Sequence, residues 1–222
     1  MIKAIIFDFD GLIFDTETFE QQSFEEVFNY YQETFPKEEW LKSIGSSGDF
    51  NPYEELLKRN THLSEEEVEK QREDHYQRII QNKGPRAGVL EYIKRAKQLQ
   101  LHLCLASSSS RKWITSHLQM IGIDINQFDF ISTSDDVTQV KPDPELYNRV
   151  LDHFDLQPSE AIVFEDSPNG SLAAIRASIP CVIVPNSVTQ QLQFDDRISL
   201  QLTSKEEKSL DEVIEFVETS IG

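Results

Sequence analysis

Five short apolar runs, each bounded by polar or turn residues, recur at wide intervals along the 222 residues of the chain. They span residues 4–7, 101–106, 128–131, 161–164 and 181–184. Runs that are nearly continuously apolar, rather than alternating, are typical of strands buried on both faces of a parallel sheet. Between the runs, apolar residues recur at helical spacing. This alternation predicts an α/β fold, a doubly wound parallel sheet with helices on both faces.

One interval, residues 16–83, contains helical patterns and no strand-like run. Its first apolar stripe consists of Phe24, Val27, Phe28, Tyr31 and Phe35. Ser64 and Glu67 have the spacing of a capping box, which predicts the start of another helix. The Asn51-Pro52 pair is typical of a further helix start.

Residues 45–48 read Gly-Ser-Ser-Gly and predict a loop between these helices. A helical insertion of this length after the first strand indicates a small domain of its own. We therefore expect residues 1–15 and 84–222 to form a discontinuous α/β core, and residues 16–83 to form a separate helical domain over the sheet.

The formal net charge is −18, spread along the chain rather than held in a tail. A nucleic-acid backbone would be repelled by such a surface, so we expect no nucleic-acid partner. No apolar run approaches the roughly 20 residues of a membrane-spanning helix, and the first residues lack a signal-peptide pattern. Cys104 and Cys181 lie in apolar runs, which predicts buried reduced thiols. We expect a cytoplasmic monomer that does not bind membranes.

The polar residues that follow the predicted strands indicate the function. In a doubly wound sheet, ligands bind at the carboxyl ends of the strands, so these residues meet at one edge. The residues after the first four runs are Asp8, Asp10, Gly11, Asp15 and Thr16; Ser107 to Ser110; Thr133 to Asp136, followed by Lys141; and Glu165 to Asn169. Four acids, a run of hydroxyls and a lysine are thus expected to converge.

Some of these residues also have a purely structural interpretation, since Asp166 and Ser110 could cap the helices that follow them. Asp8 and Asp10 are harder to explain in this way. Two acids at one strand end, beside two more from another strand, would repel each other and shift each other's pKa. A hard cation relieves that repulsion, and Mg²⁺ suits a site of a few carboxylates, waters and a phosphate.

Four motifs resemble those of the haloacid dehalogenase superfamily, in its order and at suitable spacing, and the resemblance covers nearly the whole chain. The motifs are Phe7-Asp8-Phe9-Asp10-Gly11 with Asp15-Thr16, Ala106-Ser107-Ser108, Lys141-Pro142-Asp143-Pro144, and Phe164-Glu165-Asp166-Ser167 with Asn169-Gly170. A lone D-x-D is a weak signal, whereas the full set is specific. The resemblance implies that residues 16–83 are a mobile cap that closes over the site and excludes water.

The resemblance also implies a role for each matched residue. Asp8 would be the nucleophile that forms an aspartyl-phosphate. Asp10 would protonate the leaving oxygen and then deprotonate the water or acceptor. Asp8, the backbone carbonyl of Asp10, and Asp166 would hold Mg²⁺, with Glu165 as a ligand through water or as a partner that shifts a pKa.

Substrate contacts are expected next to these residues. By the same resemblance, Ser107 and Lys141 would hold the phosphoryl oxygens, Lys141 as a point charge. The further candidate substrate-binding residues are Thr16, Glu20, Ser108 and Arg111. Arg111 could grip a second anion at the start of its helix, or it could be an exposed, solvated charge.

Within the superfamily, Asp10 argues against a dehalogenase, because that branch lacks an acid two residues after the nucleophile. The nearest likeness is the subfamily of β-phosphoglucomutase and sugar-phosphate phosphatases. The mutases hold a second phosphate with a cap arginine after a glycine loop, and the loop at residues 45–50 has no basic residue. Glu20 also stands where the mutase has a histidine.

We therefore expect a magnesium-dependent phosphatase acting on a small phosphorylated metabolite, such as a sugar phosphate. A β-phosphoglucomutase-like phosphosugar mutase is the alternative, and a catalytically silent binding protein is a second one. The sequence does not name the substrate.

Overall fold

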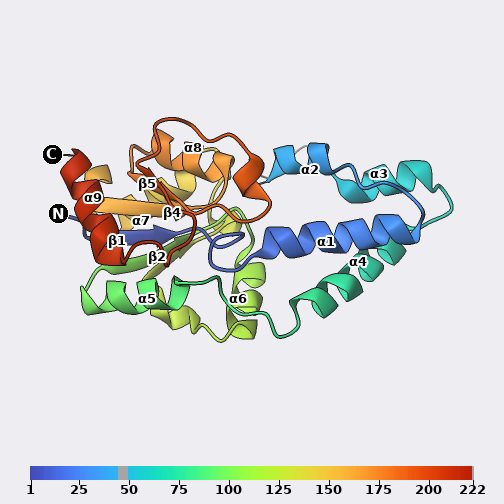
Figure 1. The fold of residues 1–222 in the computed structure, drawn as a ribbon, viewed down its shortest axis with the longest axis horizontal. Coiled ribbons are helices and arrows are strands. Elements are labelled where there is room, and N and C mark those ends of the chain that lie inside the picture. The colour runs from blue at the N-terminus through green and yellow to red at the C-terminus, as the bar shows by residue number, and fades with distance from the viewer. Residues whose placement is uncertain (45–49, 222) are drawn as a thin grey trace.

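The computed structural model describes residues 1–44 and 50–221. Its centre is a parallel six-stranded sheet in the order β3-β2-β1-β4-β5-β6 (Figure 1). The strands are β1 (Ala4–Phe7), β2 (His102–Ala106), β3 (Phe130–Ser132), β4 (Ala161–Glu165), β5 (Cys181–Ile183) and β6 (Leu200–Gln201). The first five strands overlap the five apolar runs, so the doubly wound parallel sheet is confirmed. The edge strand β6 was not predicted, because two residues are too few to form a run.

Helices cover both faces of the sheet, as the alternation of apolar runs and helical patterns predicts. They are α5 (Val89–Gln98), α6 (Arg111–Met120) and α9 (Leu210–Ile221) on one face, and α7 (Glu145–Phe154) and α8 (Pro168–Arg176) on the other. Successive side chains of a strand point to opposite faces. In β1, Ile5 and Phe7 pack toward the first set of helices, and Ala4 and Ile6 pack toward the second. Short 3-10 turns lie at Ile125–Gln127, Ser134–Asp136, Pro158–Glu160 and Thr189–Gln191.

Four helices lie beyond the carboxyl ends of the strands, at the right of Figure 1. They are α1 (Thr16–Tyr30), α2 (Lys37–Ser43), α3 (Pro52–Arg59) and α4 (Glu65–Ile80). Helices α1 and α4 lie side by side. The four helices share a hydrophobic cluster, which includes Phe24, Val27, Phe28, Leu56 and Val68 and which Val188 joins from the loop after β5. This segment thus has a packed interior apart from the two faces of the sheet.

The helix starts in this segment follow the local sequence signals. Helix α4 begins with the predicted capping box, in which the backbone N–H of Ser64 donates to Glu67 Oε2 at 3.0 Å and that of Glu67 donates to Ser64 Oγ at 3.3 Å. Helix α3 begins after Asn51, whose side chain accepts from the backbone of Tyr53. The loop predicted at residues 45–48 lies outside the described residues.

The predicted apolar stripe, from Phe24 to Phe35, continues beyond the end of helix α1. The helix ends at Tyr30, and Gln32 adopts a left-handed conformation with φ of 60°, which turns the chain out of the helix. Phe35 is therefore not part of α1. It returns to the same cluster from the following loop, where its ring stacks on Phe24 with centroids 5.8 Å apart.

The two connections between this segment and the sheet are joined to each other. The backbone N–H of Arg86 donates to the carbonyl of Ile13 at 2.8 Å. The guanidinium of Arg86 donates to the carbonyl of Gly11, and also to those of Val184 and Pro185 at 2.9 and 2.7 Å. The chain thus leaves and re-enters the sheet region at one place.

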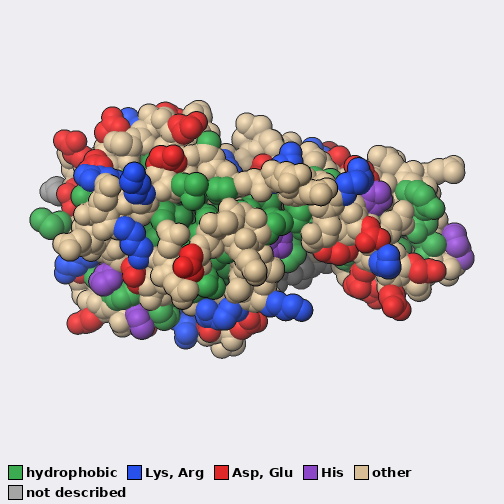
Figure 2. Space-filling view, turned by 90° about the horizontal axis from the view of Figure 1, so that it is seen from below, with side chains coloured by type: hydrophobic (Ala, Val, Ile, Leu, Met, Phe, Trp, Pro, Cys, Tyr) green, Lys and Arg blue, Asp and Glu red, His purple; other side chains and the backbone are tan. Residues whose placement is uncertain are grey.

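The distribution of charged side chains and the state of the two cysteines agree with the sequence analysis. Acidic and basic side chains are interspersed over the face in Figure 2, at both ends of the molecule. Cys104 and Cys181 are buried free thiols, as predicted. In the described part of the chain, no helix has the length and apolar character needed to cross a membrane.

Candidate active site

Asp8 of the first motif meets Glu165 and Asp166 of the fourth motif between β1 and β4, where the strand order of the sheet reverses. Strands β1 and β4 are neighbours, with Phe7 opposite Phe164, although the chain visits β2 and β3 between them. Asp8 follows β1, and its backbone N–H donates to the carbonyl of Phe164 at 3.0 Å. Glu165 ends β4 and Asp166 follows it. Crevices at such switch points are the usual ligand sites of doubly wound sheets.

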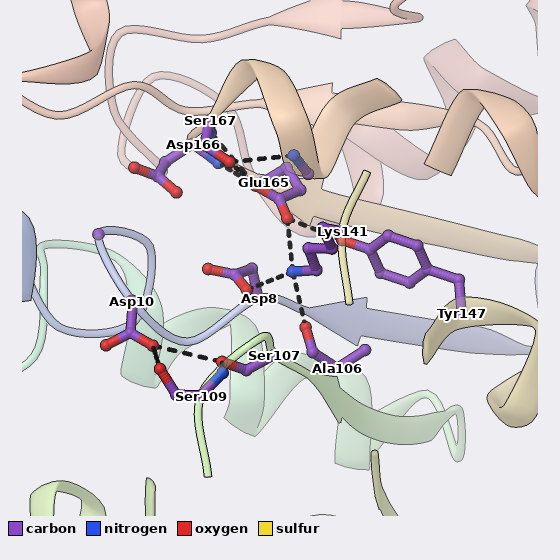
Figure 3. Close-up of polar contacts among 12 residues, drawn as sticks. Asp8, Asp10, Ala106, Ser107, Ser109, Lys141, Tyr147, Glu165, Asp166 and Ser167 are labelled. Atoms are coloured by element: carbon purple, nitrogen blue, oxygen red, sulfur yellow. Dashed lines mark hydrogen bonds and ion pairs between the residues drawn. The ribbon is translucent and has the colours of Figure 1, made fainter. Parts of the chain in front are cut away.

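Lys141 joins this cluster from the loop before α7 (Figure 3). Its ammonium donates to Asp8 Oδ1, to Glu165 Oε1 at 2.7 Å and to the carbonyl of Ala106 at 2.9 Å. The lysine is only 2% exposed, so its three protons are used inside the protein. Tyr147 adds a hydroxyl that donates to Glu165 Oε1 at 2.8 Å. Lys141 is thereby held in contact with the carboxylates at the ends of both β1 and β4.

Burial and mutual repulsion shift the pKa values in this cluster. Burial raises the pKa of Asp8 well above its usual value, against the opposing attraction of Lys141. Burial, with the nearby charge of Glu165, raises the pKa of Asp166 to about 7. Burial also raises the pKa of Glu17. Burial alone would lower the pKa of Lys141, but its two carboxylate partners raise it above its usual value. Lys141 therefore does not offset the cost of burying Asp8, Asp166 and Glu17 as carboxylates.

Glu165 is saturated by hydrogen bonds on both oxygens. Besides Lys141 and Tyr147 on Oε1, its Oε2 accepts from the backbone N–H groups of Asp166 and Ser167 at 3.0 and 3.2 Å, and from Ser167 Oγ at 3.1 Å. These contacts fix the carboxylate in one orientation. Glu165 lies within a group of three acids close enough to hold a metal ion, but a direct bond to the ion would displace one of its donors.

Asp166 is the acid with a vacant oxygen. Its Oδ2 accepts from Asn186 Nδ2 at 2.8 Å and from Thr189 Oγ1 at 3.4 Å, whereas its buried Oδ1 has no hydrogen-bond partner. Oxygens of Asp8, Glu165 and Asp166 lie within 4.8 Å of one another. A buried carboxylate oxygen without a donor, in an all-oxygen cluster with excess negative charge, fits a hard divalent cation such as Mg²⁺.

The carboxylate of Asp10 lies apart from this cluster, among neutral donors. Its Oδ1 accepts from Thr16 Oγ1 at 2.9 Å and from Trp113 Nε1 at 2.8 Å. Its Oδ2 accepts from Ser109 Oγ at 2.6 Å and from Ser107 Oγ at 3.3 Å. The two acids at the end of β1 thus have different surroundings, one ionic and one neutral.

Most of the predicted site residues line one cavity of about 400 Å³. Those on its wall are Asp8, Asp10, Glu20, Ser107, Ser108, Lys141 and Asp166. Thr16 is buried beside the cavity and contacts Asp10. Glu165 is buried behind the cavity wall.

Arg111 is the exception among the predicted substrate contacts. Its guanidinium donates to Asp136 at 2.8 Å and to the carbonyl of Ile131 at 3.0 Å, away from the cavity. Its position at the exposed start of α6 and the pairing with Asp136 explain why it does not reach the site. In this structure the charge of Arg111 is paired with that of Asp136.

Of the two residues that could have been helix caps, Ser110 is one and Asp166 is not. Ser110 caps α6 by accepting from the backbone of Trp113. Asp166 does not cap α8, because Ser167 is the cap and accepts from the backbone of Gly170 at 3.1 Å.

Several cavity residues escaped the sequence analysis, among them Glu17, Trp40 and Trp113. Glu17 follows Thr16 in the first turn of α1, and as a further acid beside the first motif it could have been found. Trp113 lies three residues after Ser110 in an ordinary helix start, and no local pattern singles it out. Asn186, which donates to Asp166 and to Glu17 Oε2 at 2.6 Å, was also missed.

Comparison with known proteins agrees with the motifs. A family model for haloacid dehalogenase-like hydrolases matches residues 5–184. The putative phosphatase YhcW of Bacillus subtilis is 45% identical over 197 residues, covering 88% of this chain and 89% of the relative. The phosphorylated carbohydrates phosphatase of Thermotoga maritima is 28% identical over 189 residues, covering 80% and 82%. The crystal structure of CbbY from Rhodobacter sphaeroides in complex with phosphate matches with a TM-score of 0.73 at 25% identity, covering 93% and 96%.

The family resemblance of the four motifs is thereby confirmed. The family model spans most of the chain, and a relative with 45% identity covers 88% of it. The chain therefore belongs to the haloacid dehalogenase-like hydrolase family of enzymes.

Proposed function

We propose that the chain is a magnesium-dependent phosphatase that hydrolyses a small phosphorylated metabolite through a covalent aspartyl-phosphate on Asp8. The contrast between the two carboxylates at the end of β1 carries this proposal. Asp8 touches the ammonium of Lys141, and its carboxylate lies within 4.8 Å of the carboxylate of Asp166, which has one oxygen without a partner. Asp10 faces the same cavity but is held by hydroxyls and an indole. One acid is placed to attack phosphorus and the other to exchange a proton.

The residues suited to hold Mg²⁺ are Asp8 and Asp166, with Glu165 orienting the cluster from behind. When bound there, the ion would offset the repulsion between the carboxylates and polarise the phosphoryl oxygens. Because Asn186 and Thr189 donate to Oδ2 of Asp166, its Oδ1 is available to bind the ion.

In the first half-reaction, a carboxylate oxygen of Asp8 attacks phosphorus and the bond from phosphorus to the ester oxygen breaks. Asp10 gives its proton to the departing oxygen. The ammonium of Lys141 offsets the negative charge of the phosphoryl oxygens in the transition state, and the hydroxyl of Ser107 donates to them. In the second half-reaction, Asp10 takes a proton from water, the water oxygen bonds to phosphorus, and the bond to Asp8 breaks to release phosphate.

The donors around Asp10 assign the proton to one of its oxygens. The indole N–H of Trp113 can only donate, so Oδ1 must accept. Thr16 Oγ1 accepts from the backbone of Gly11 at 3.2 Å, which leaves its own proton for the same oxygen. The hydroxyls of Ser107 and Ser109 on Oδ2 can donate or accept. The transferable proton of Asp10 therefore resides on Oδ2.

The cavity wall favours transfer to water over transfer to a second phosphorylated substrate. Lys141 is the only lysine or arginine on the described wall, and the sequence of residues 45–49 contains neither. Glu17 and Glu20 on that wall supply no positive charge to hold a second phosphate. This combination supports a phosphatase rather than a mutase that must bind a bisphosphate.

A sugar phosphate or a related polyhydroxylated phosphate ester suits the rest of the wall. The aromatic face of Trp40 and the hydrogen-bonding groups of Glu20 and Ser108 suit a polyol. Burial raises the pKa of Glu20 to about 7, against the opposing attraction of Arg72. The relative from Thermotoga maritima is named for phosphorylated carbohydrates, which supports the same class. We assign residues 16–83 the role of a cap, because α1 and α2 supply Glu20 and Trp40.

A direct test is phosphate release from p-nitrophenyl phosphate and from a panel of sugar phosphates, with and without Mg²⁺. We expect magnesium-dependent release by the wild type and none by Asp8→Asn. Asp152→Asn, an exposed acid of α7, is the matched control and should behave as wild type. Absence of release across the panel would favour a silent binding protein. Bisphosphate-dependent interconversion of glucose 1-phosphate and glucose 6-phosphate would favour the mutase.

A further inference from the structure

Trp113 occupies an unusual position between the core and the helical segment. It belongs to α6, which packs on the sheet, and its indole N–H donates to Asp10 Oδ1 at 2.8 Å. The same side chain lines the cavity. A tryptophan offers a single directional donor on a rigid ring, so the position of the ring sets the position of the carboxylate.

The indole is itself held by two buried rings. His117, one turn along α6, has its ring 4.0 Å from that of Trp113, and its Nδ1 lies 2.9 Å from the carbonyl of Trp113. Tyr76 stacks on the indole with centroids 5.8 Å apart and an interplanar angle of 27°. The Tyr76 hydroxyl lies 3.0 Å from His117 Nε2. The carbonyl of Trp113 can only accept, so neutral His117 carries its proton on Nδ1 and accepts from Tyr76.

Tyr76 reaches the hydrophobic cluster of the sheet from the helical segment. It lies on α4, within residues 16–83, and it is fully buried against α6. One turn earlier on α4, Arg72 lies over the ring of Tyr76 at 5.2 Å and over that of Phe24 at 5.3 Å. The rings thus form a continuous path from the interior of the helical segment, through Tyr76 and Trp113, to the carboxylate of Asp10.

We propose that Trp113 is a positioning residue that orients Asp10 for proton transfer, and that the Tyr76–His117 pair couples this orientation to the seating of α4 on the core. The proposal rests on the proposed function, because it presupposes that Asp10 protonates the leaving group. When α4 moves away, Tyr76 leaves the indole and its hydrogen bond to His117 breaks. The carboxylate of Asp10 then loses its fixed donor, so proton transfer is efficient only with the helical segment seated.

The dependence of the rate on the leaving group tests this coupling. An alkyl phosphate needs its leaving oxygen protonated, whereas p-nitrophenolate leaves with little help from an acid. The measured quantity is kcat/KM, which reports all steps through formation of the phosphoenzyme. Trp113→Phe keeps the ring and removes the donor. Its kcat/KM should fall about tenfold or more for a sugar phosphate, the effect of one hydrogen bond to the charge that develops on Asp10 as its proton leaves. For p-nitrophenyl phosphate, the fall should be less than about threefold.

Tyr76→Phe tests the coupling while leaving the indole intact, and it remains informative should Trp113→Phe fail to fold. It removes one neutral hydrogen bond, so the same selective loss should appear at about fivefold. The matched control is Tyr92→Phe, since the hydroxyl of Tyr92 is a similarly buried donor, at 2.7 Å from the carbonyl of Lys208 and away from the cavity. The ratio of the two substrates should not change in this control.

Each outcome has a distinct meaning. An unchanged substrate ratio in Trp113→Phe overturns the positioning role, and an unchanged ratio in Tyr76→Phe overturns the coupling to α4. An equal loss on both substrates overturns the proposal as well, because a merely structural defect would not distinguish leaving groups. Failure of the wild type on every phosphate ester would instead refute the proposed function.

Discussion

The space beside Glu165 provides a quantitative test of the buried cluster. Gly170, in the first turn of α8, has no side chain where the carboxylate lies. A Cβ added there would be 1.8 Å from Glu165 Oε1 and 2.0 Å from its carboxyl carbon, far inside contact distance. The carboxylate can move only by breaking hydrogen bonds, because Lys141, Tyr147 and Ser167 all hold it. We predict that Gly170→Ala forces Glu165 away from Lys141.

The expected magnitude follows from opposing effects. Alanine in a helix is favoured over glycine by about 1 kcal/mol. Overpacking costs about 1–3 kcal/mol, and the upper end applies to an overlap with a fixed carboxylate. Partial loss of a buried ion pair, worth about 3–5 kcal/mol when fully broken, adds to this cost. The net destabilisation should be about 2 kcal/mol or more, a fall in Tm of about 4–8 °C for a chain of this length.

Thermal unfolding followed by circular dichroism measures this change, and phosphatase activity should fall with it because Lys141 loses its alignment. Gly84→Ala is the matched control, since nothing lies within 4 Å of the Cβ that it would add. Its stability should be unchanged or raised by up to about 1 kcal/mol. A Gly170→Ala protein that melts at or above the wild-type temperature and keeps its activity would refute the packing argument.

Three further predictions concern the reaction and its metal. Asp10→Asn should slow turnover by about 100-fold or more yet still form some phosphoenzyme from p-nitrophenyl phosphate, whereas Asp8→Asn should form none; equal phosphoenzyme loss in both would contradict the division of roles. Because the pKa of Asp166 is raised to about 7, the native metal-free protein holds a proton that the unfolded chain has released. Its stability should therefore fall as the pH rises from about 4 to about 7. Mg²⁺ should restore Tm at the upper end, and a metal-free stability that rises across this window would contradict the assignment. Beryllium fluoride with Mg²⁺ should slow hydrogen exchange in residues 16–83 by seating the cap, and unchanged exchange and small-angle scattering would count against closure.

The parts of the site that the sequence predicts are those fixed by strand order and local pattern. The proximity of Asp8 and Asp166 could be predicted from the sequence, because parallel strands place their carboxyl ends at one edge of the sheet. The helix starts at Asn51 and Ser64 could also be predicted, since a cap is decided within three or four residues. These features depend on short stretches of chain or on a rule that holds for the whole fold class.

The parts that could not be predicted depend on packing between distant elements. The contact of Trp113 with Asp10 requires the exact placement of α6, and its stacking on Tyr76 requires that of α4. Phe35 has helical spacing but reaches its cluster from a loop, because apolar periodicity does not reveal where a helix ends. Arg111 was a plausible anion contact until Asp136, 25 residues away, proved to be its partner.

The hydrogen bond between Ile13 and Arg86 has an evolutionary consequence. A segment whose two ends meet at one point can be lengthened, shortened or exchanged with little strain on the fold that carries it. The acids that follow β1 and β4 and the lysine before α7 lie outside this segment and depend on the sheet for their positions. With the proposed role of residues 16–83 as a cap, substrate choice and bond-breaking chemistry can change independently in evolution, and a different set of helices grafted between these two residues is expected to alter the first while preserving the second.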